Sequence, residues 1–232
     1  MHSSLRLGAV LGLASLGLAA LPAAQAQVTP TYYSGNFTQD DNIQMFMFTV
    51  TSPGNVYLYT TSYGGGSNVD GTSSNAGGFD TVLSVFDSTG TFINDNDDSI
   101  IQQVDPLTGL AYDAGLQLTL TPGTYQVALT EYDNFAKASP TYGPGGGLTN
   151  LSDGFTQQGN GNFTTGFNLN GTTYPSFVDS GGYERTSAYN LNLGNGTLAA
   201  VPEASTTISF GLLLALGLGG FAVAAKKKKA AA

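Results

Sequence analysis

Short stretches in which apolar and polar residues alternate, separated by glycine-rich turns, fill the middle of this 232-residue chain. In the stretch 45–51, for example, Phe46, Phe48 and Val50 fall on one face of an extended strand. The chain contains 32 glycines, and no helical 3.6-residue stripe of apolar residues occurs before Ile208. The pattern therefore predicts an all-β fold for the central part of the chain.

Turn sequences rich in Pro, Gly and Asp predict three hairpins. Their turns are Pro53-Gly54-Asn55, Asp87-Ser88-Thr89-Gly90 and Thr121-Pro122-Gly123. The hairpins pair 45–51 with 56–60, 81–86 with 91–94, and 116–120 with 125–131. A closing strand is expected at 188–193, whereas 138–162 is typical of a long loop. Seven or eight strands of this kind predict a two-sheet antiparallel β-sandwich, jelly-roll-like, as an ectodomain over 27–194.

The N-terminal end predicts export. Arg6 precedes an apolar run over 7–21, and the small-x-small sequence Ala24-Gln25-Ala26 follows it. This arrangement is typical of a signal peptide over 1–26 that is cleaved after Ala26. An uncleaved anchor helix is the alternative.

The C-terminal end combines a short motif, an apolar segment and a basic cluster. Residues 208–225 carry no charge, and at about 1.5 Å rise per residue they span roughly 27 Å, close to the thickness of the hydrocarbon layer of a bilayer. Residues 195–207 form a polar linker before it, and 226–232 form a tail after it. Basic residues resist translocation, so we expect one transmembrane helix with the tail in the cytoplasm. The basic residues are Lys226, Lys227, Lys228 and Lys229.

This end of the chain resembles the PEP-CTERM sorting signal of Gram-negative bacteria, which consists of V-P-E-P, a transmembrane stretch and a basic cluster. Val201, Pro202 and Glu203 match the motif, and Ala204 stands where a second proline is usual. Pro202 keeps the motif extended and accessible to a protease. The resemblance implies processing by an exosortase-like membrane enzyme and anchoring or release at the cell surface or in the extracellular matrix. An anchor that no enzyme processes is the alternative.

Composition excludes several classes of function. Residues 27–200 carry fifteen Asp and Glu against Lys137 and Arg185, a net charge near −13 that disfavours binding to nucleic acid. The chain has no cysteine, and its one histidine, His2, lies in the predicted signal peptide. The mature domain therefore has no Ser-His-Asp triad, Cys-His pair or histidine-bound metal. We expect a protein that is not an enzyme.

Acidic residues are densest at Asp95-Asn96-Asp97-Asp98, and Asp80 precedes the same predicted hairpin. With Ser88 and Thr89 at the tip, Asp80 would face Asp97, and a bulge at Gly90 would change that partner to Asp98. Oxygen ligands without His or Cys suit calcium better than a transition metal. The candidate calcium ligands are Asp80, Asp95, Asp97 and Asp98. Alternatively, Asp97 and Asp98 cap a turn and face solvent.

A second resemblance covers about residues 40–133. The sequences Phe79-Asp80-Thr81, Asn96-Asp97-Asp98 and Leu120-Thr121-Pro122-Gly123-Thr124-Tyr125 look like the bacterial pre-peptidase C-terminal domain. This resemblance implies a non-catalytic β-sandwich, and some modules related to that domain bind calcium or polymeric substrates.

These features together predict an exported, non-enzymatic surface or matrix protein associated with extracellular polysaccharide. One alternative is a carbohydrate-binding module that stacks sugars on tyrosines. Its candidate residues are Tyr57, Tyr59, Tyr132 and Tyr142. The least favoured alternative is a glycoside hydrolase, which would need two carboxylates.

Overall fold

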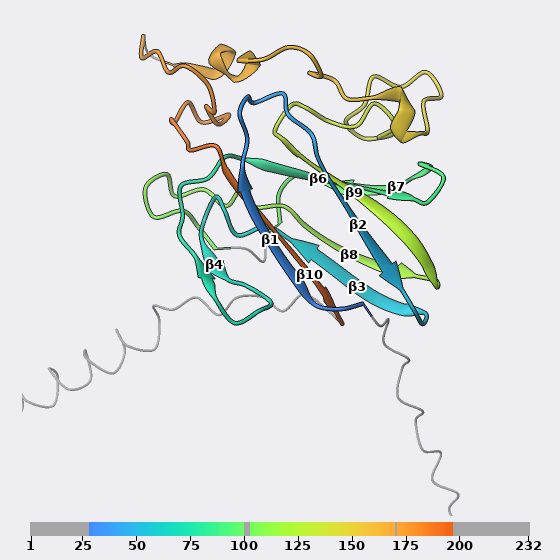
Figure 1. The fold of residues 1–232 in the computed structure, drawn as a ribbon. Coiled ribbons are helices and arrows are strands. Elements are labelled where there is room, and N and C mark those ends of the chain that lie inside the picture. The colour runs from blue at the N-terminus through green and yellow to red at the C-terminus, as the bar shows by residue number, and fades with distance from the viewer. Residues whose placement is uncertain (1–27, 100–102, 170, 197–232) are drawn as a thin grey trace, which may run out of the picture.

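The computed structural model describes residues 28–99, 103–169 and 171–196 (Figure 1). Within these residues the regular structure is almost entirely β, and two short 3₁₀ helices are the only helices. The strands are β1 (Thr31–Asn36), β2 (Gln44–Val50), β3 (Gly54–Tyr59), β4 (Gly66–Ser67), β5 (Ser73–Ser74), β6 (Thr81–Asp87), β7 (Phe92–Asn96), β8 (Gly115–Leu120), β9 (Gly123–Glu131) and β10 (Ala188–Asn195). The 3₁₀ helices are η1 (Leu151–Asp153) and η2 (Phe163–Phe167). The predicted all-β class is confirmed.

The long strands form two four-stranded antiparallel sheets. The first has the order β1-β10-β3-β8 and the second has the order β2-β9-β6-β7. Both sheets contribute to one apolar core, which includes Leu58 and Leu193 from the first and Val85 and Val127 from the second. β2, β3, β8, β9 and β10 each turn alternate apolar residues into this core, as the alternating pattern predicts.

Two of the three predicted hairpins are wrong. β2 pairs with β9 in the second sheet, whereas β3 pairs with β10 and β8 in the first. In the same way, β8 and β9 belong to different sheets. The inward faces are nevertheless as predicted, because Phe48, Val50, Val56 and Leu58 are all buried. A chain that crosses from one sheet to the other keeps its apolar residues in the same core, so alternation alone does not distinguish a crossing from a hairpin.

The third hairpin, β6–β7, is confirmed. Next to the turn Phe86 faces Phe92, which is the register predicted with a bulge at Gly90, but a second shift changes the register farther along the strands. Leu83 faces Asn96, Val85 faces Asn94, and the pairing shifts between Val85 and Phe86. Continued beyond β7, this register would place Asp97 next to Val82 and neither predicted partner directly opposite Asp80. This second shift lies within the strands, beyond the turn, and therefore escaped a prediction based on the turn alone.

Residues 136–155, which follow β9 and which we call the covering segment, lie over the outer face of the second sheet, above β6 and β9 in Figure 1. Ala136, Ala138 and Phe155 of this segment form a second apolar cluster with Phe86 of β6 and Ala128 of β9. Residues 138–162 contain no strand, as predicted, but they are packed on the sheet. Residues 81–86 of β6 and 127–131 of β9 are consequently buried on both faces of the second sheet, whereas its edge strands β2 and β7 keep exposed residues.

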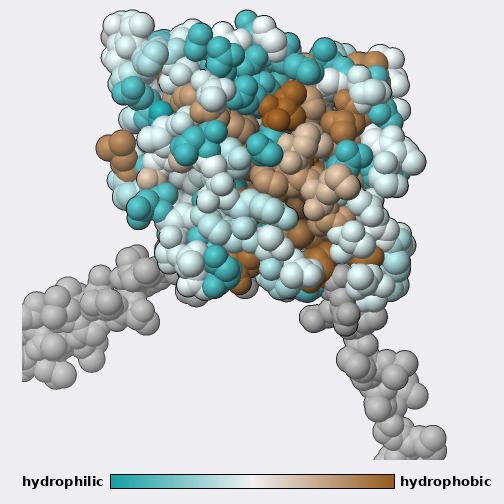
Figure 2. Space-filling model, in the orientation of Figure 1, coloured by the Kyte–Doolittle hydropathy of each residue, from teal (hydrophilic) through white to brown (hydrophobic). Residues whose placement is uncertain are grey.

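Apolar side chains also gather over β2 and between β2 and β1 in the view of Figure 2. Tyr33 of β1 and Phe46 of β2 have ring centroids 4.9 Å apart, and Phe46 also contacts Tyr189 of β10 at 6.4 Å. These aromatic rings close the side of the fold between the edge strands of the two sheets.

Several predicted features lie outside the described residues. They are the signal peptide with Ala24 and Ala26, the sorting motif 201–203 and the lysine cluster 226–229. The predicted transmembrane segment 208–225 also lies outside them. Among the residues that the structure does describe, no helix is long and apolar enough to cross a membrane.

Candidate metal centre

Three of the four predicted calcium ligands come together at one end of the β6–β7 hairpin. Asp80 immediately precedes β6, and Asp97 and Asp98 follow β7. One carboxylate oxygen of each residue lies within 4.8 Å of the corresponding oxygens of the other two. Asp95 does not belong to this group. We call Asp80, Asp97 and Asp98 the carboxylate triad.

Two members of the triad are buried without partners. Asp80 is 1 % exposed and Asp97 is 8 % exposed, while Asp98 is open to solvent. The Oδ1 atoms of Asp80 and Asp97 accept no hydrogen bond from the described residues. A buried carboxylate oxygen without a donor or a cation is costly, because it has lost its water and gained nothing in return.

Protein cations do not compensate this negative charge. Of the two basic residues in the described part of the chain, Arg185 forms its ion pair with Asp105, and Lys137 forms no ion pair with a described residue. Three carboxylates this close repel one another unless protons or a cation neutralise them.

The pKa values reflect this repulsion. Burial, followed by the negative charges of Asp97 and Asp98, raises the pKa of Asp80 well above its usual value. Burial and the neighbouring Asp98 and Asp95 raise the pKa of Asp97 to about 7. Burial also raises the pKa of Asp98, and Asp113 adds to the effect. In the absence of metal, the fold therefore favours protons on this group.

Turn capping does not explain Asp97. Its side chain is buried rather than solvent-facing, and its Oδ1 has no backbone N–H donor. At the other end of the hairpin, Asp87 does cap a turn: its Oδ1 accepts from the backbone N–H groups of Thr89 at 2.8 Å and Thr91 at 2.9 Å. The two ends of one hairpin thus use aspartate in different ways.

Asp95 lies on β7 opposite Ser84 of β6. Burial raises its pKa, and a hydrogen bond from Ser139 opposes that rise. Ser139 belongs to the segment that covers the second sheet. Asp95 therefore contacts the covering segment and is separate from the triad.

Sequence reasoning missed Glu131, at the end of β9. Glu131 is 1 % exposed, and neither carboxylate oxygen has a hydrogen-bond partner among the described residues. Burial, then the charges of Asp40 and Asp179, raise its pKa well above the usual value. The signal was present, because Glu131 continues the inward-facing alternation of Val127 and Leu129.

The four tyrosines proposed as sugar platforms differ in exposure. Tyr57 and Tyr59 pack together at 5.8 Å on β3 and are half-buried. Tyr132 is also half-buried, against Phe135 and Phe167. Tyr142 alone among the four is exposed, and its ring stacks on Phe135 at 4.6 Å.

The geometry suits a hard cation better than catalysis. Three carboxylates supply oxygen ligands, and calcium takes 6–8 such ligands in flexible arrangements, with carbonyl groups and water completing the shell. Asp80 is almost completely buried, so a polymeric substrate has no access to it. Two-carboxylate hydrolysis requires both groups to flank the scissile bond.

A comparison with known protein families finds no match for the chain, and a comparison with curated proteins likewise finds none.

Proposed function

We propose that this chain is an exported, non-enzymatic surface or matrix protein whose β-domain holds calcium at the carboxylate triad. The observation that carries the calcium proposal is the unpartnered, buried Oδ1 of Asp80 beside two further carboxylates. A bound calcium ion, with its charge of +2, would offset most of the negative charge of the three groups and supply the partner that Oδ1 of Asp80 lacks.

The proposal also covers the jelly-roll class of the fold and the export of the protein to the cell surface or matrix. The orders β1-β10-β3-β8 and β2-β9-β6-β7, with consecutive strands crossing between sheets, support the jelly-roll class. The signal peptide, the PEP-CTERM-like motif and the lysine cluster of the sequence support export, processing by an exosortase-like enzyme and association with extracellular polysaccharide.

The calcium proposal is tested on the full chain in a mild detergent after treatment with a chelator. Calorimetric titration with calcium chloride should show saturable binding to the wild type, and thermal unfolding should show a higher Tm with calcium. At the triad, Asp97→Asn should abolish the calcium-dependent rise in Tm. Without calcium, the same variant should be more stable than the wild type at pH 8, because it removes a charge that the fold disfavours.

Asp87→Asn is the matched control, because it lies on the same hairpin, also removes one charge, and keeps the Oδ1 acceptor of the turn. It should retain the full calcium response. Equal Tm values with calcium and with chelator in the wild type would refute the metal site.

The sorting proposal is tested by mass spectrometry of the exported protein. We expect a chain that begins at Gln27 and has lost Lys226–Lys229. A replacement of Val201, Pro202 and Glu203 by alanine should leave the lysines attached. Recovery of the wild-type lysines on the exported form would contradict processing.

A further inference from the structure

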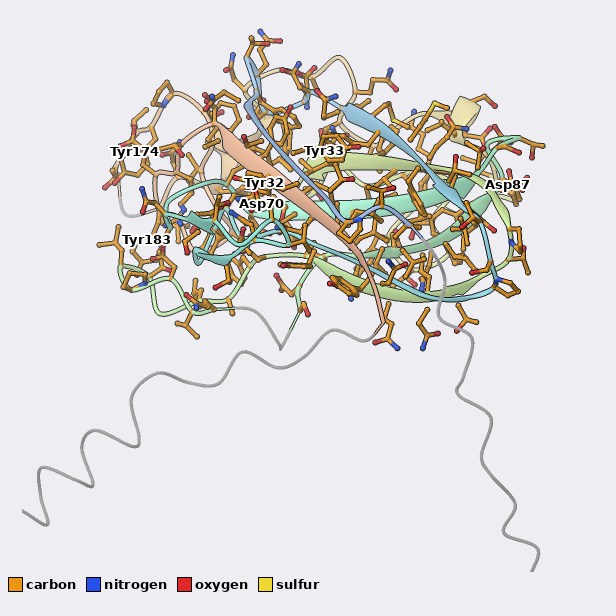
Figure 3. All side chains as sticks on the ribbon, turned by 60° about the horizontal axis from the view of Figure 1, so that its bottom comes forward. Tyr32, Tyr33, Asp70, Asp87, Tyr174 and Tyr183 are labelled. Atoms are coloured by element: carbon orange, nitrogen blue, oxygen red, sulfur yellow. The ribbon has the colours of Figure 1, made fainter. Side chains whose placement is uncertain are left out.

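A cavity of about 410 Å³ lies between three loops at the end of the fold that also carries the triad. Its lining includes Ala76 from the loop before β6, Asp105 and Leu107 from the loop before β8, and Arg185 from the loop before β10. Arg185 donates through Nε to the carbonyl of Gly78, two residues before Asp80. In Figure 3 the labelled Tyr183, from the same loop as Arg185, lies at the opposite end of the molecule from the Asp87 turn.

A buried guanidinium forms one wall of this cavity. The Arg185 side chain is 1 % exposed and pairs with Asp105 through Nη2 and Oδ2 at 2.8 Å. Its Nη2 also donates to the carbonyl of Tyr63 at 3.0 Å, and its guanidinium carbon lies 4.0 Å from the centre of the Tyr63 ring. No described residue accepts a hydrogen bond from the remaining nitrogen, Nη1, which carries two N–H groups.

Hydrogen bonds also hold the carboxylate of Asp105 in place. Oδ1 of Asp105 accepts from the backbone N–H groups of Leu107 and Thr108, both at 2.8 Å. Glu184, which also lines the cavity, is exposed and adds a second carboxylate at the rim. Each carboxylate oxygen has two lone pairs. Leu107 and Thr108 use both lone pairs of Asp105 Oδ1, so a hydroxyl ligand can bind Asp105 only at Oδ2, which also accepts from Arg185, and can bind the carboxylate of Glu184.

Charge and apolar surface narrow the class of ligand. Two carboxylates against one guanidinium leave the cavity with a net negative charge, and the surrounding domain is strongly acidic. An anionic ligand is therefore repelled. Ala76, Pro106 and Leu107 add apolar walls, and Leu107 is 75 % exposed beside the cavity. A neutral sugar unit presents the complementary groups: hydroxyls that both donate and accept, and apolar C–H faces.

We propose that this cavity binds one neutral sugar unit of a polysaccharide, with Arg185 as donor, Asp105 and Glu184 as acceptors, and Leu107 against a ring face. The inference rests on the proposed association with extracellular polysaccharide. It adds the position of the binding site in the fold and the expectation that the bound sugar is uncharged. The volume falls within the range of small-molecule sites, about 300–1,000 Å³. Because Asp105 is held in an ion pair and by two backbone donors, it serves as a fixed acceptor, and we expect binding without cleavage.

The test uses the full chain in a polyoxyethylene detergent, which contains no sugar. Calorimetric titration is carried out with three neutral hexasaccharides, of β-1,4-glucose, β-1,4-mannose and α-1,6-glucose, and with hexagalacturonate as the acidic comparison. We expect saturable binding of at least one neutral probe, at least about tenfold weaker binding of the acidic one, and no shortened products by mass spectrometry.

Variants then locate the site. Ala76→Phe places a ring at the exposed edge of the cavity and should weaken binding of the neutral probe at least about tenfold, and Leu107→Ala should weaken it about threefold. Leu148→Ala, another leucine at the surface but outside the cavity lining, is the matched control and should change the affinity less than about twofold. Replacing Arg185 or Asp105 would break a buried ion pair and endanger folding, so the test avoids both.

Several results would overturn the inference: no binding of any neutral probe, tighter binding of hexagalacturonate, cleavage of a probe, or unchanged affinity in Ala76→Phe. Failure here is distinguishable from failure of the calcium proposal. A chain that binds calcium but no neutral probe keeps the metal site and loses the sugar site. A chain that binds a neutral probe but no calcium shows the reverse.

Discussion

Glu131 is a buried acidic residue whose charge the surroundings disfavour. It points toward the core, as its place after Val127 and Leu129 requires, but no described residue donates a hydrogen bond to either of its carboxylate oxygens. The same alternation that predicts the strand thus also predicts this burial. The approximate grouping of Asp80, Asp97 and Asp98 was likewise predictable, because a hairpin brings the residues before its first strand close to those after its second strand, although the exact register was not. The absence of Asp95 from the triad was not predictable from the sequence, because Asp95 contacts Ser139 of the covering segment.

The buried Glu131 predicts a specific pH dependence of stability. Its pKa in the folded state is raised, so the folded chain holds a proton that the unfolded chain loses near its ordinary pKa. The stability that this proton provides is complete below about pH 4 and is lost as the pH rises through the folded pKa. Glu131→Gln should therefore be more stable than the wild type at pH 8, by about 1–3 kcal/mol in denaturant unfolding, and should lose less stability between pH 5 and pH 8.

Glu184→Gln supplies the control, since Glu184 is exposed and its replacement removes the same charge. This variant should show the wild-type slope of stability against pH. A Glu131→Gln variant less stable than the wild type at pH 8 would mean that the carboxylate is charged and compensated in the fold.

At the scale of elements, seven strands were predicted, β1, β4 and β5 were missed, and most strand partners were not predictable. Alternation located β2, β3, β8 and β9 and their inward faces, but their pairing depends on which sheet each strand joins. That choice is made by contacts between elements far apart in the sequence, such as β1 with β10. A turn sequence such as Thr121-Pro122-Gly123 reverses the chain equally well within one sheet or between two. Of the three predicted hairpins, only β6–β7, where the turn carries Gly90 at φ 83°, is a local hairpin.

The covering segment is the least regular element, yet its packing predicts a large effect of a single replacement. Phe155 is buried in the cluster with Phe86 and Ala128, so Phe155→Ala leaves a cavity on the outer face of the second sheet. We expect a loss of about 3–5 kcal/mol in the free energy of unfolding, measured by urea denaturation.

Leu169→Ala removes an apolar side chain that is largely exposed and should cost less than about 1 kcal/mol. A loss of under about 1 kcal/mol for Phe155→Ala would show that the segment contributes little to the stability of the sheet beneath it.

For the whole molecule, charge balance is the dominant constraint. Fifteen carboxylates against two basic residues in 27–200 repel one another across the surface, and the triad adds a local repulsion inside. Composition alone predicts the first effect. The second required the fold, because it depends on oxygens that lie within 4.8 Å of one another. The two effects respond differently to ions, since surface repulsion is screened by any salt, whereas a buried site selects by size and ligand number.

This difference leads to a prediction for the full chain. Raising sodium chloride from 10 to 150 mM should raise the Tm by a few degrees, because the Debye length falls from about 30 Å to about 8 Å. Calcium chloride at 1 mM, which changes the ionic strength little, should raise the Tm further, and magnesium chloride at 1 mM should do so much less, because Mg²⁺ gives up its water reluctantly and demands a tighter octahedral shell. Differential scanning calorimetry at pH 7.5 measures all three. Equal rises in Tm with calcium and with magnesium would mean that screening of surface charges causes the stabilisation. The buried oxygens of Asp80 and Asp97 would then bind protons and no calcium ion.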